Sequence, residues 1–285
     1  MRNFPKKRLL FLSITGILLL ALVLWIHWGN TALELNSYTV TSPELPESFD
    51  GFRIAHVSDL HNAQIGDENE NLLAMLRKAK PDMIAITGDL IDSRSTDIAV
   101  ALAFAEEAVK IAPCYYVTGN HESRIDDYDK LKDGLIRLGV TVLEDAAVSL
   151  TRSGQSITVL GVVDPAFQTD RSSDKALMID QLTALSDQAQ GYTLLLSHRP
   201  ELFSVYADAG IDLVLTGHAH GGQFRLPFAG GLVAPNQGLF PEYDAGLYTQ
   251  GHTHMLVSRG IGNSLFPFRF NNRPEVLLIE LQCDD

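Results

Sequence analysis

The stretch from Phe52 to Asp89, "FRIAHVSDLHNAQIGDENENLLAMLRKAKPDMIAITGD", decides how this chain folds. It opens and closes with apolar runs of strand length, "FRIAHVSD" and "DMIAITGD", and each run ends in an aspartate. The segment between them, "ENENLLAMLRKAK", has helical spacing of its apolar residues and stops before a proline. A strand, a helix and a strand in this order predict two parallel strands joined by a right-handed crossover.

The same alternation continues along the chain. Apolar strand-like runs recur at 114–120, 156–164, 192–198 and 211–218, and helical spacing recurs at 97–112, 127–139, 173–189 and 200–210. Two further strand-like runs, 254–260 and 275–282, follow without a helix between them. We therefore predict an α/β fold in which two mixed β-sheets pack together and helices flank them.

The first part of the chain predicts a membrane anchor. Residues 9–28, "LLFLSITGILLLALVLWIHW", are an uncharged run long enough to cross a hydrocarbon core of about 30 Å. Four basic residues precede it, Arg2, Lys6, Lys7 and Arg8. The positive-inside rule then places the N-terminus in the cytoplasm and the rest of the chain on the outer side, periplasmic or extracellular. A cleaved secretory signal is the alternative.

Length and composition set the expected domain organisation. At 285 residues, 46% of them apolar, the chain is long enough for a well-buried core. With the anchor, this predicts a cytoplasmic tip and a single-pass helix at 1–29, a linker at 30–50 and one folded domain at 51–285. The net charge of −13 argues against nucleic acid as a partner, because nucleic acid needs clustered Lys and Arg. The oligomeric state stays open.

Polar side chains follow five of the predicted strands. They stand where the apolar runs end, at Asp59 and His61, Asp89, Asn120 and His121, His198, and His218 and His220. Because ligands of such sheets bind beyond the carboxyl ends of the strands, we expect these side chains to meet. Asp59 and His61 of "DLH" are two residues apart, as are the histidines of "GHAH", so in an extended backbone the two side chains of each pair would point to one side. Each residue alone has a structural explanation as a turn, a cap or a hydrogen-bonded imidazole; together they favour one site.

The donor atoms of this set indicate a metal centre. Seven side chains offer oxygen and nitrogen without thiolate: Asp59, His61, Asp89, Asn120, His198, His218 and His220. Such a set suits Mn²⁺, Fe or Zn²⁺ better than Mg²⁺ or Cu(I). Seven ligands are too many for one tetrahedral ion but enough for two ions that share a carboxylate, and two ions can clamp a phosphoryl group.

Five motifs of this chain resemble those of the calcineurin-like metallophosphoesterase family. They are "DLH", "GDLID", "GNHE", "LLSHRPE" and "GHAHGGQ", and the resemblance runs from about Phe52 to Leu281. The tail "VSRGIGNSLFPFRFNNRPEVLLIEL" resembles the bacterial membrane-anchored or exported branch, which includes phosphodiesterases and a UDP-2,3-diacylglucosamine pyrophosphohydrolase. The resemblance implies an αββα metallophosphoesterase sandwich for residues 51–285.

The resemblance also implies a role for each site residue. One divalent metal ion would be held by Asp59, His61, Asp89 and His220, and a second by Asp89, Asn120, His198 and His218. Asp89 would then bridge the two ions, which would be Mn, Fe or Zn. A metal-bridging hydroxide would attack phosphorus. His121 would stand near the leaving oxygen as a general acid or as a stabiliser of the transition state.

Other charged residues have two interpretations. Arg199 could meet a substrate phosphate or be a solvated surface charge. Arg259 and Arg269 could also meet substrate, or form structural salt bridges. Glu122 could orient His121 or simply begin a helix.

We predict a membrane-anchored phosphoesterase that cleaves a phosphodiester or a pyrophosphate. A lipid-linked substrate such as UDP-2,3-diacylglucosamine would fit the anchor, because tethering raises the local concentration at the bilayer. The irregular apolar segments of the final third could form a wall for acyl chains or be ordinary loops. A phosphomonoesterase is the alternative within the class. A non-catalytic scaffold on the same fold and a metal-dependent amidase or peptidase are alternatives outside it.

Overall fold

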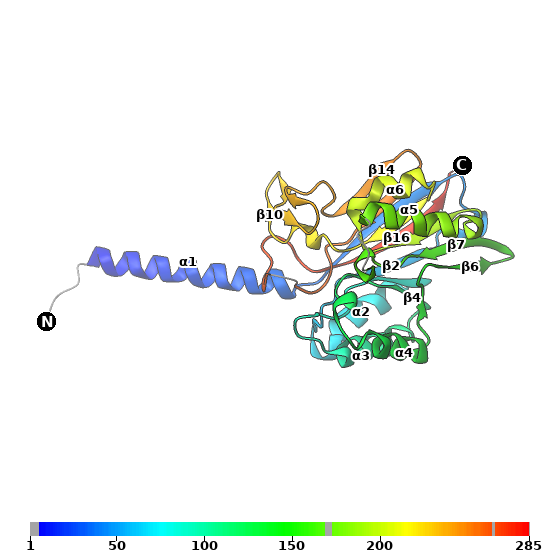
Figure 1. The fold of residues 1–285 in the computed structure, drawn as a ribbon. Coiled ribbons are helices and arrows are strands. Elements are labelled where there is room, and N and C mark those ends of the chain that lie inside the picture. Colours follow the sequence, from blue (N-terminus) through cyan, green and yellow to red (C-terminus); the bar gives the residue numbers. More distant parts are fainter. Residues whose placement is uncertain (1–5, 169–172, 264–265, 285) are drawn as a thin grey trace.

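Two six-stranded β-sheets pack face to face, with helices on the outside of both (Figure 1). The computed structural model describes residues 6–168, 173–263 and 266–284. The predicted cytoplasmic tip, with Arg2, lies mostly outside these residues. The predicted α/β fold of two mixed sheets flanked by helices is confirmed.

The first sheet carries the strands that begin the sequence motif. Its strand order is β1 (Glu34–Ser42), β16 (Glu275–Cys283), β2 (Arg53–Val57), β3 (Met83–Thr87), β4 (Cys114–Val117) and β5 (Thr141–Val142). All neighbours are parallel except β16 and β2, which are antiparallel. Three helices belong to this half of the molecule: α2 (Glu70–Ala79), α3 (Ile98–Ala108) and α4 (Tyr128–Leu138).

The second sheet carries the later motifs. Its strand order is β14 (Gly246–Gln250), β15 (Thr253–Val257), β9 (Leu213–Thr216), β8 (Thr193–Leu196), β7 (Gln155–Gly161) and β6 (Ala146–Arg152). The central strands β7, β8, β9 and β15 are parallel, and each edge strand is antiparallel to its neighbour. Helices α5 (Asp174–Leu185) and α6 (Phe203–Asp208) lie on the outside of this sheet.

Apolar side chains from both sheets form the central core. Ile54 and Ile279 of the first sheet belong to the same buried cluster as Leu194 and Leu215 of the second. Strands β3, β8 and β9 are buried at every residue. Burial on both faces explains why these strands read as continuous apolar runs and were predictable.

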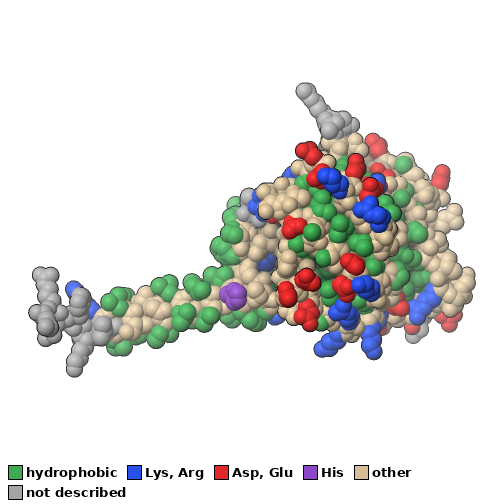
Figure 2. Space-filling view, turned by 90° about the horizontal axis from the view of Figure 1, so that it is seen from below, with side chains coloured by type: hydrophobic (Ala, Val, Ile, Leu, Met, Phe, Trp, Pro, Cys, Tyr) green, Lys and Arg blue, Asp and Glu red, His purple; other side chains and the backbone are tan. Residues whose placement is uncertain are grey.

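Helix α1 (Lys6–Thr31) projects away from the two sheets (Figure 1). Its segment Leu10–Thr31 has a mean hydropathy of 2.4, and no part of its most apolar window is buried inside the protein. Hydrophobic side chains cover the visible surface of the helix (Figure 2). By length and composition this segment could cross a membrane, as the sequence predicted.

The predicted linker at residues 30–50 is wrong over nine of its residues. Glu34–Ser42 form β1, which pairs in parallel with β16 along its whole length. The strand alternates partly buried and exposed residues instead of forming an apolar run, so the sequence pattern did not reveal it. Residues 32 and 33 join α1 to β1, and residues 43–52 join β1 to β2.

Four strands of two residues each separate β9 from β14. They form two antiparallel hairpins, β10 (Arg225–Leu226) with β11 (Gly230–Gly231), and β12 (Val233–Ala234) with β13 (Gly238–Leu239). In Figure 1 these hairpins lie beside the end of α1 that joins the domain.

Candidate metal centre

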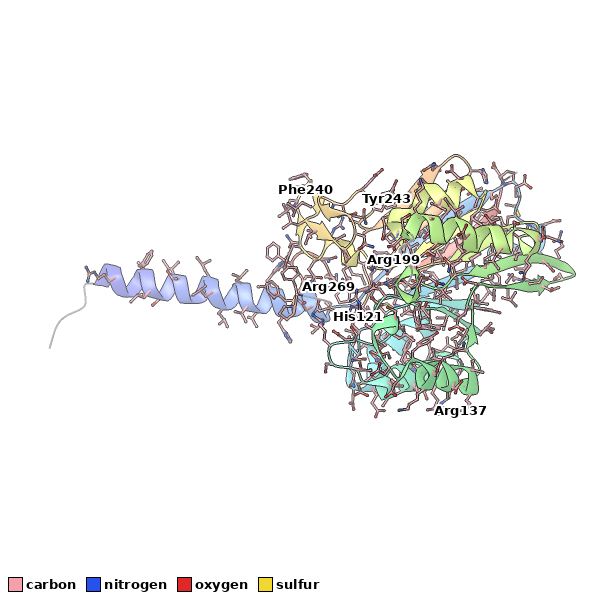
Figure 3. All side chains as sticks on the ribbon, in the orientation of Figure 1. His121, Arg137, Arg199, Phe240, Tyr243 and Arg269 are labelled. Atoms are coloured by element: carbon pink, nitrogen blue, oxygen red, sulfur yellow. The ribbon has the colours of Figure 1, made fainter. Side chains whose placement is uncertain are left out.

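The loops that follow β2, β3, β4, β8 and β9 meet at one end of the two sheets. They carry the seven predicted ligands, and the structure brings all of them together in a buried cluster: Asp59, His61, Asp89, Asn120, His198, His218 and His220. Each is at most 6% exposed. The centre lies between the helices of the first half and those of the second, where Figure 3 shows His121.

Two groups of donor atoms form within this cluster. In the first, Nε2 of His220 lies 3.3 Å from Oδ1 of Asp59 and 3.2 Å from Nε2 of His61. The second contains Asp89, His198 and His218. There, Nε2 of His198 lies 3.2 Å from Oδ2 of Asp89. Each group draws residues from both sheets, so the centre joins the two sheets.

Asp89 stands between the two groups. Its Oδ2 atom is 3.2 Å from His198 of the second group and 3.4 Å from Nε2 of His61 in the first. The other oxygen, Oδ1, accepts a hydrogen bond from the backbone N–H of His121. One carboxylate is therefore positioned to serve both groups.

The backbone at the ligands is unusual. Asp59, His61, Asp89, His218 and His220 all have φ between 47° and 66°, in the left-handed region that non-glycine residues rarely adopt. The prediction that "GHAH" and "DLH" are extended at these residues is therefore wrong. The side chains converge because the chain turns sharply at each ligand.

Glu122 holds two of these turns in place. Its buried carboxylate accepts hydrogen bonds from the backbone N–H groups of Asp89, Leu90 and Gly119, at 2.8–3.0 Å. Burial and the nearby charge of Asp89 raise the pKa of Glu122 to about 7. Glu122 also begins a short 3₁₀-helix, Glu122–Arg124, and no described contact joins its carboxylate to the His121 ring. Its main role is to fix the loops after β3 and β4.

Glycine is required where these loops touch. A Cβ on Gly119 would lie 2.3 Å from Oδ1 of Asp89, and one on Gly217 would lie 1.9 Å from Oγ of Ser58. Both contacts are too short for any side chain. Gly119 lets the loop after β4 approach Asp89 of the same sheet, and Gly217 lets the loop after β9 approach Ser58 of the other sheet.

The electrostatics of the cluster favour a bound cation. Burial opposes the charge on Asp59, but His220 and His198 hold the pKa of this carboxyl below its usual value. Burial would lower the pKa of His198, but Asp89 and Asp59 raise it to about 10. Burial lowers the pKa of His220 to about 3, so that imidazole is neutral. Two buried carboxylates therefore face imidazole nitrogens, and their negative charges stabilise positive charge between them.

Two orientations in the cluster also fit metal binding. Oδ1 of Asn120 is buried and has no hydrogen-bond partner among the described residues. Nδ1 of His198 lies 2.6 Å from the carbonyl oxygen of Thr87, which can only accept, so Nδ1 carries a proton. Asp89 and Asp59 favour a second proton on Nε2, and a metal ion that displaced this proton would meet the lone pair of Nε2. That lone pair and the Asn120 oxygen are what a divalent cation would bind.

His121 is held with its outer nitrogen free. Its Nδ1 atom accepts a hydrogen bond of 3.0 Å from the backbone N–H of Ser93. In the neutral ring the proton is then on Nε2, and this Nε2–H group can donate a hydrogen bond. Burial lowers the pKa of His121 to about 4. The sequence did not predict Ser93, since a serine after "GDLID" has no distinctive pattern.

A cleft of about 400 Å³ opens beside the centre. Its lining includes the site residues Asp89, His121 and His218 together with three arginines, Arg94, Arg124 and Arg199. Asp174 also lines the cleft, and Arg94 is paired with Asp92. The sequence did not predict Arg94 or Arg124, because a single arginine in a loop has no distinguishing pattern.

Arg199 is buried, so its interpretation as a solvated charge is wrong. Its guanidinium donates to both carboxylate oxygens of Asp164 at 2.6 Å, and its Nη1 atom lies 3.4 Å from Nε2 of His218. Asp164 follows β7, 35 residues earlier in the chain, and no sequence pattern predicts this pairing. The bidentate pair fixes a cation at the wall of the cleft.

Arg269 connects the centre to α1, and Arg259 forms ion pairs nearby. Nη2 of Arg269 lies 3.4 Å from Nδ1 of His220, and the backbone of Arg269 exchanges two hydrogen bonds with the side chain of Asn30 at the end of α1. Burial lowers the pKa of Arg269 to about 10. Arg259 forms ion pairs with Glu34 and Glu275, as its structural interpretation proposed.

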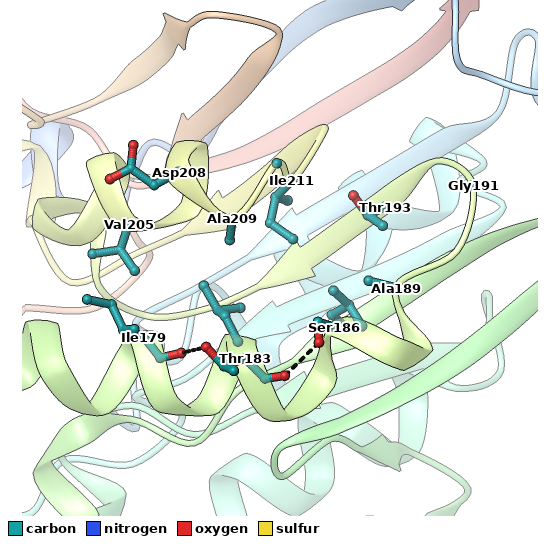
Figure 4. A pocket seen from close by; sticks show the side chains of 13 residues that line it. Ile179, Thr183, Ser186, Ala189, Gly191, Thr193, Val205, Asp208, Ala209 and Ile211 are labelled. Carbon is teal, nitrogen blue, oxygen red and sulfur yellow. Dashed lines mark hydrogen bonds between the residues drawn. The ribbon is translucent and has the colours of Figure 1, made fainter.

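A second cavity of about 480 Å³ lies between α5 and α6 (Figure 4). It reaches Thr193, where β8 begins, whereas the metal centre lies beyond the end of that strand. None of the site residues lines it. The cleft beside His121 is therefore the one that serves the centre.

The fold and the site together define a class of protein. Residues 52–222, more than half of the chain, match the calcineurin-like phosphoesterase family. The chain therefore belongs to this family, and it is a metallophosphoesterase, a hydrolase of phosphoric esters.

Relatives of known sequence extend the match beyond that segment. The chain is 29% identical to the uncharacterized metallophosphoesterase YkuE of Bacillus subtilis, over 88% of this chain and 86% of the relative. It is also 29% identical to the phosphodiesterase YaeI of Escherichia coli, over 81% and 82% of the two chains. Among solved structures, TT1561 of Thermus thermophilus has the same fold, with a TM-score of 0.53 and 14% identity over 74% of this chain and 90% of that one.

Proposed function

We propose that the protein is a dinuclear metal-dependent phosphodiesterase. The observation that carries this proposal is the convergence of seven buried oxygen and nitrogen donors. Six of them form two groups of three, Asp89 of the second group also faces His61 of the first, and Asn120 lines the same cleft as Asp89 and His218. One ion would be held by Asp59, His61, Asp89 and His220, and the other by Asp89, Asn120, His198 and His218. The donors suit Mn, Fe or Zn.

The residues of the centre prepare it for phosphoryl transfer. Two bound divalent ions would supply Lewis-acid activation of water and of the phosphoryl oxygens. Asp89 faces both groups of donors, so it can fix the spacing of the two ions. The left-handed backbone at the ligands and the three hydrogen bonds to Glu122 hold this geometry before substrate arrives.

His121 stabilises the transition state of the proposed reaction. It lines the cleft, and the hydrogen bond from Ser93 leaves its proton on the outer nitrogen. A hydrogen bond donated by Nε2–H would stabilise the charge that develops on the leaving oxygen. This contribution matters most when the leaving group is a poor one, as an alkyl alcohol is.

The cleft supports a diester or a pyrophosphate as the substrate. Three arginines line its wall: Arg94 and Arg199 are held by Asp92 and Asp164, and Arg124 adds positive charge beside them. Their guanidinium N–H groups can bind a second phosphate or the anionic part of a larger substrate. The Escherichia coli relative is itself named a phosphodiesterase. The cleft is open on one side, so the substituents on phosphorus can extend out of it.

Helix α1 supports a membrane location. We propose that residues 1–29 comprise a cytoplasmic tip and a single-pass anchor, and that residues 51–285 form the catalytic domain on the outer side of the cell membrane. The segment Leu10–Thr31 has the required length and hydropathy, and basic residues precede it. A substrate linked to lipid would then be held near the cleft.

A substrate panel tests this function. Purified full-length protein loaded with Mn²⁺ is expected to hydrolyse bis(p-nitrophenyl) phosphate and lipid-linked phosphodiesters or pyrophosphates faster than p-nitrophenyl phosphate. Chelation should abolish all of these activities, and added Mn²⁺ should restore them. Faster hydrolysis of the monoester would show a phosphomonoesterase instead, and activity that survives complete metal removal would overturn the proposal.

A further inference from the structure

A cluster of exposed apolar side chains lies on the two hairpins and the segment after residue 265. We call it the hairpin surface, and it consists of Leu226, Phe228, Leu239, Phe240, Phe266 and Phe268. Phe228 is fully exposed, and Leu239 and Phe240 are 70% and 60% exposed. Outside α1, these six are most of the exposed large apolar side chains among the described residues. Backbone hydrogen bonds join their segments, from the N–H of Leu232 to Phe224 and from the N–H of Phe240 to Leu232.

The hairpin surface carries no charge at its centre. The sequence from Leu226 to Phe240 contains no Lys, Arg, Asp or Glu, although charged residues make up 20% of the chain. The arginine that precedes it, Arg225, is neutralised by Asp244 at 2.9 Å. An apolar surface without charges fits an apolar partner better than a charged macromolecule.

The hairpin surface is continuous with the domain end of α1. Phe224 packs against Phe266 and Phe268, with ring centroids 5.1 and 5.4 Å apart, and forms a β-bridge with Phe270. Arg269, between Phe268 and Phe270, is hydrogen-bonded to Asn30 of α1. Figure 3 shows Phe240 on the side of the domain from which α1 projects.

We propose that the hairpin surface inserts into the lipid bilayer that α1 crosses. The proposal rests on the proposed membrane anchoring. The two tryptophans of the chain, Trp25 and Trp28, lie at the same end of α1, where an interfacial aromatic belt is expected. Exposed phenylalanines beside them would enter the same boundary between headgroups and acyl chains. The domain would then be held against the outer leaflet at two places.

This contact would orient the cleft toward the lipid surface. Pro235 and Asn236, at the turn between β12 and β13, line the cleft together with His121 and His218. Leu239 and Phe240 of the same hairpin belong to the hairpin surface. One hairpin therefore reaches from the proposed bilayer contact to the metal centre, so a phosphate group on a lipid could enter the cleft without leaving the membrane.

Depth-dependent fluorescence quenching tests the proposal in the full-length protein. A polarity-sensitive fluorophore is attached at Phe228→Cys or Phe240→Cys, with Arg137→Cys on the far side of the domain as the control (Figure 3). The background carries Cys283→Ser. Cys114 can stay, because burial raises the pKa of its thiol to about 12 and leaves it unreactive. The protein is reconstituted in phosphatidylcholine and phosphatidylglycerol vesicles, with and without lipids that carry a nitroxide near the headgroup.

We expect the quencher lipids to reduce the fluorescence at positions 228 and 240 roughly twofold or more, because interfacial segments insert about 5–10 Å. The label at position 137 should be unaffected. Unquenched labels at 228 and 240, or a blue shift there that depends on protein concentration instead of lipid, would overturn the proposal; the second result would indicate a second copy of the chain.

Trp25 and Trp28 provide an internal control, since the chain has no other tryptophan. Quenched tryptophans with unquenched labels would retain the anchor and refute only the bilayer contact. Unquenched tryptophans would refute both. Hydrolysis of bis(p-nitrophenyl) phosphate by the same samples reports the proposed catalytic function separately.

Discussion

The metal centre and the hairpin surface are neighbours in the chain but differ in every physical respect. His220 is a buried candidate ligand with a strained backbone, and Phe228, eight residues later, is fully exposed. The loops after β3 and β4 are fixed by three hydrogen bonds from backbone N–H groups to the carboxylates of Glu122 and Asp89, whereas the hairpins have strands of two residues each. The difference separates two tasks: chemistry needs fixed donor positions, and contact with lipid needs only an exposed apolar surface.

Removing the shared carboxylate of Asp89 should have the largest effect on metal content and activity. Asp89→Ala takes a ligand from both groups of donors, so we expect the loss of both metal ions and a fall in activity of at least roughly 10³-fold. Metal analysis and hydrolysis of bis(p-nitrophenyl) phosphate measure both effects. The matched control is Asp126→Ala, at an exposed aspartate between β4 and α4, and it should behave as wild type.

His121→Ala should lower turnover while leaving the metals bound. Loss of a hydrogen bond to the leaving oxygen costs about 10²–10³-fold on a substrate with an alkyl leaving group, and much less on p-nitrophenolate, which is a stable anion. The ratio of the two rates measures this difference. His252→Ala, an exposed histidine, is the control. Equal losses on both substrates would show that His121 does not act on the leaving oxygen.

Much of the centre could be predicted from sequence because its residues follow apolar runs that are buried on both faces. The left-handed turns at Asp59 and His218 could not, because local patterns do not reveal a conformation that tertiary contacts impose. The burial of Arg199 depends on Asp164, which is distant in the chain. Strand β1 was missed because it alternates polar and apolar residues at the sheet edge, beside β16.

Glu122→Gln should destabilise the centre without removing a ligand. Glutamine offers one side-chain acceptor oxygen to the three backbone N–H groups that the carboxylate now satisfies, so at least one loses its partner. We expect a loss of about 2 kcal/mol in the free energy of unfolding. This corresponds to a melting temperature lower by roughly 4–8 °C, measured by circular dichroism. Glu106→Gln, on the exposed face of α3, should leave the melting temperature unchanged.

Arg269→Gln tests the connection between the two regions. Arg269 donates to the carbonyl oxygens of Arg259 and Gly262 and lies beside His220, so the shorter side chain should loosen that ligand. We expect metal affinity to fall by about tenfold, measured by competition with a chelator. Unchanged affinity would show that Arg269 only secures the end of α1.

The smallest effect is expected at the hairpin surface. Phe228→Ser combined with Phe240→Ser removes two exposed rings, and neither residue lines the cleft beside the metal centre. The free energy of unfolding should change by no more than about 0.5 kcal/mol. Hydrolysis of bis(p-nitrophenyl) phosphate should stay at the wild-type rate, and a loss of metals in this variant would erase the contrast between the two regions.

The central claim is that five loops build one dinuclear centre around Asp89. The most direct measurement is a crystal structure of the Mn²⁺-loaded protein with anomalous diffraction from manganese. We predict two anomalous peaks about 3.5–4 Å apart, with Asp89 in contact with both. A single peak, or two peaks that Asp89 does not join, would contradict the account.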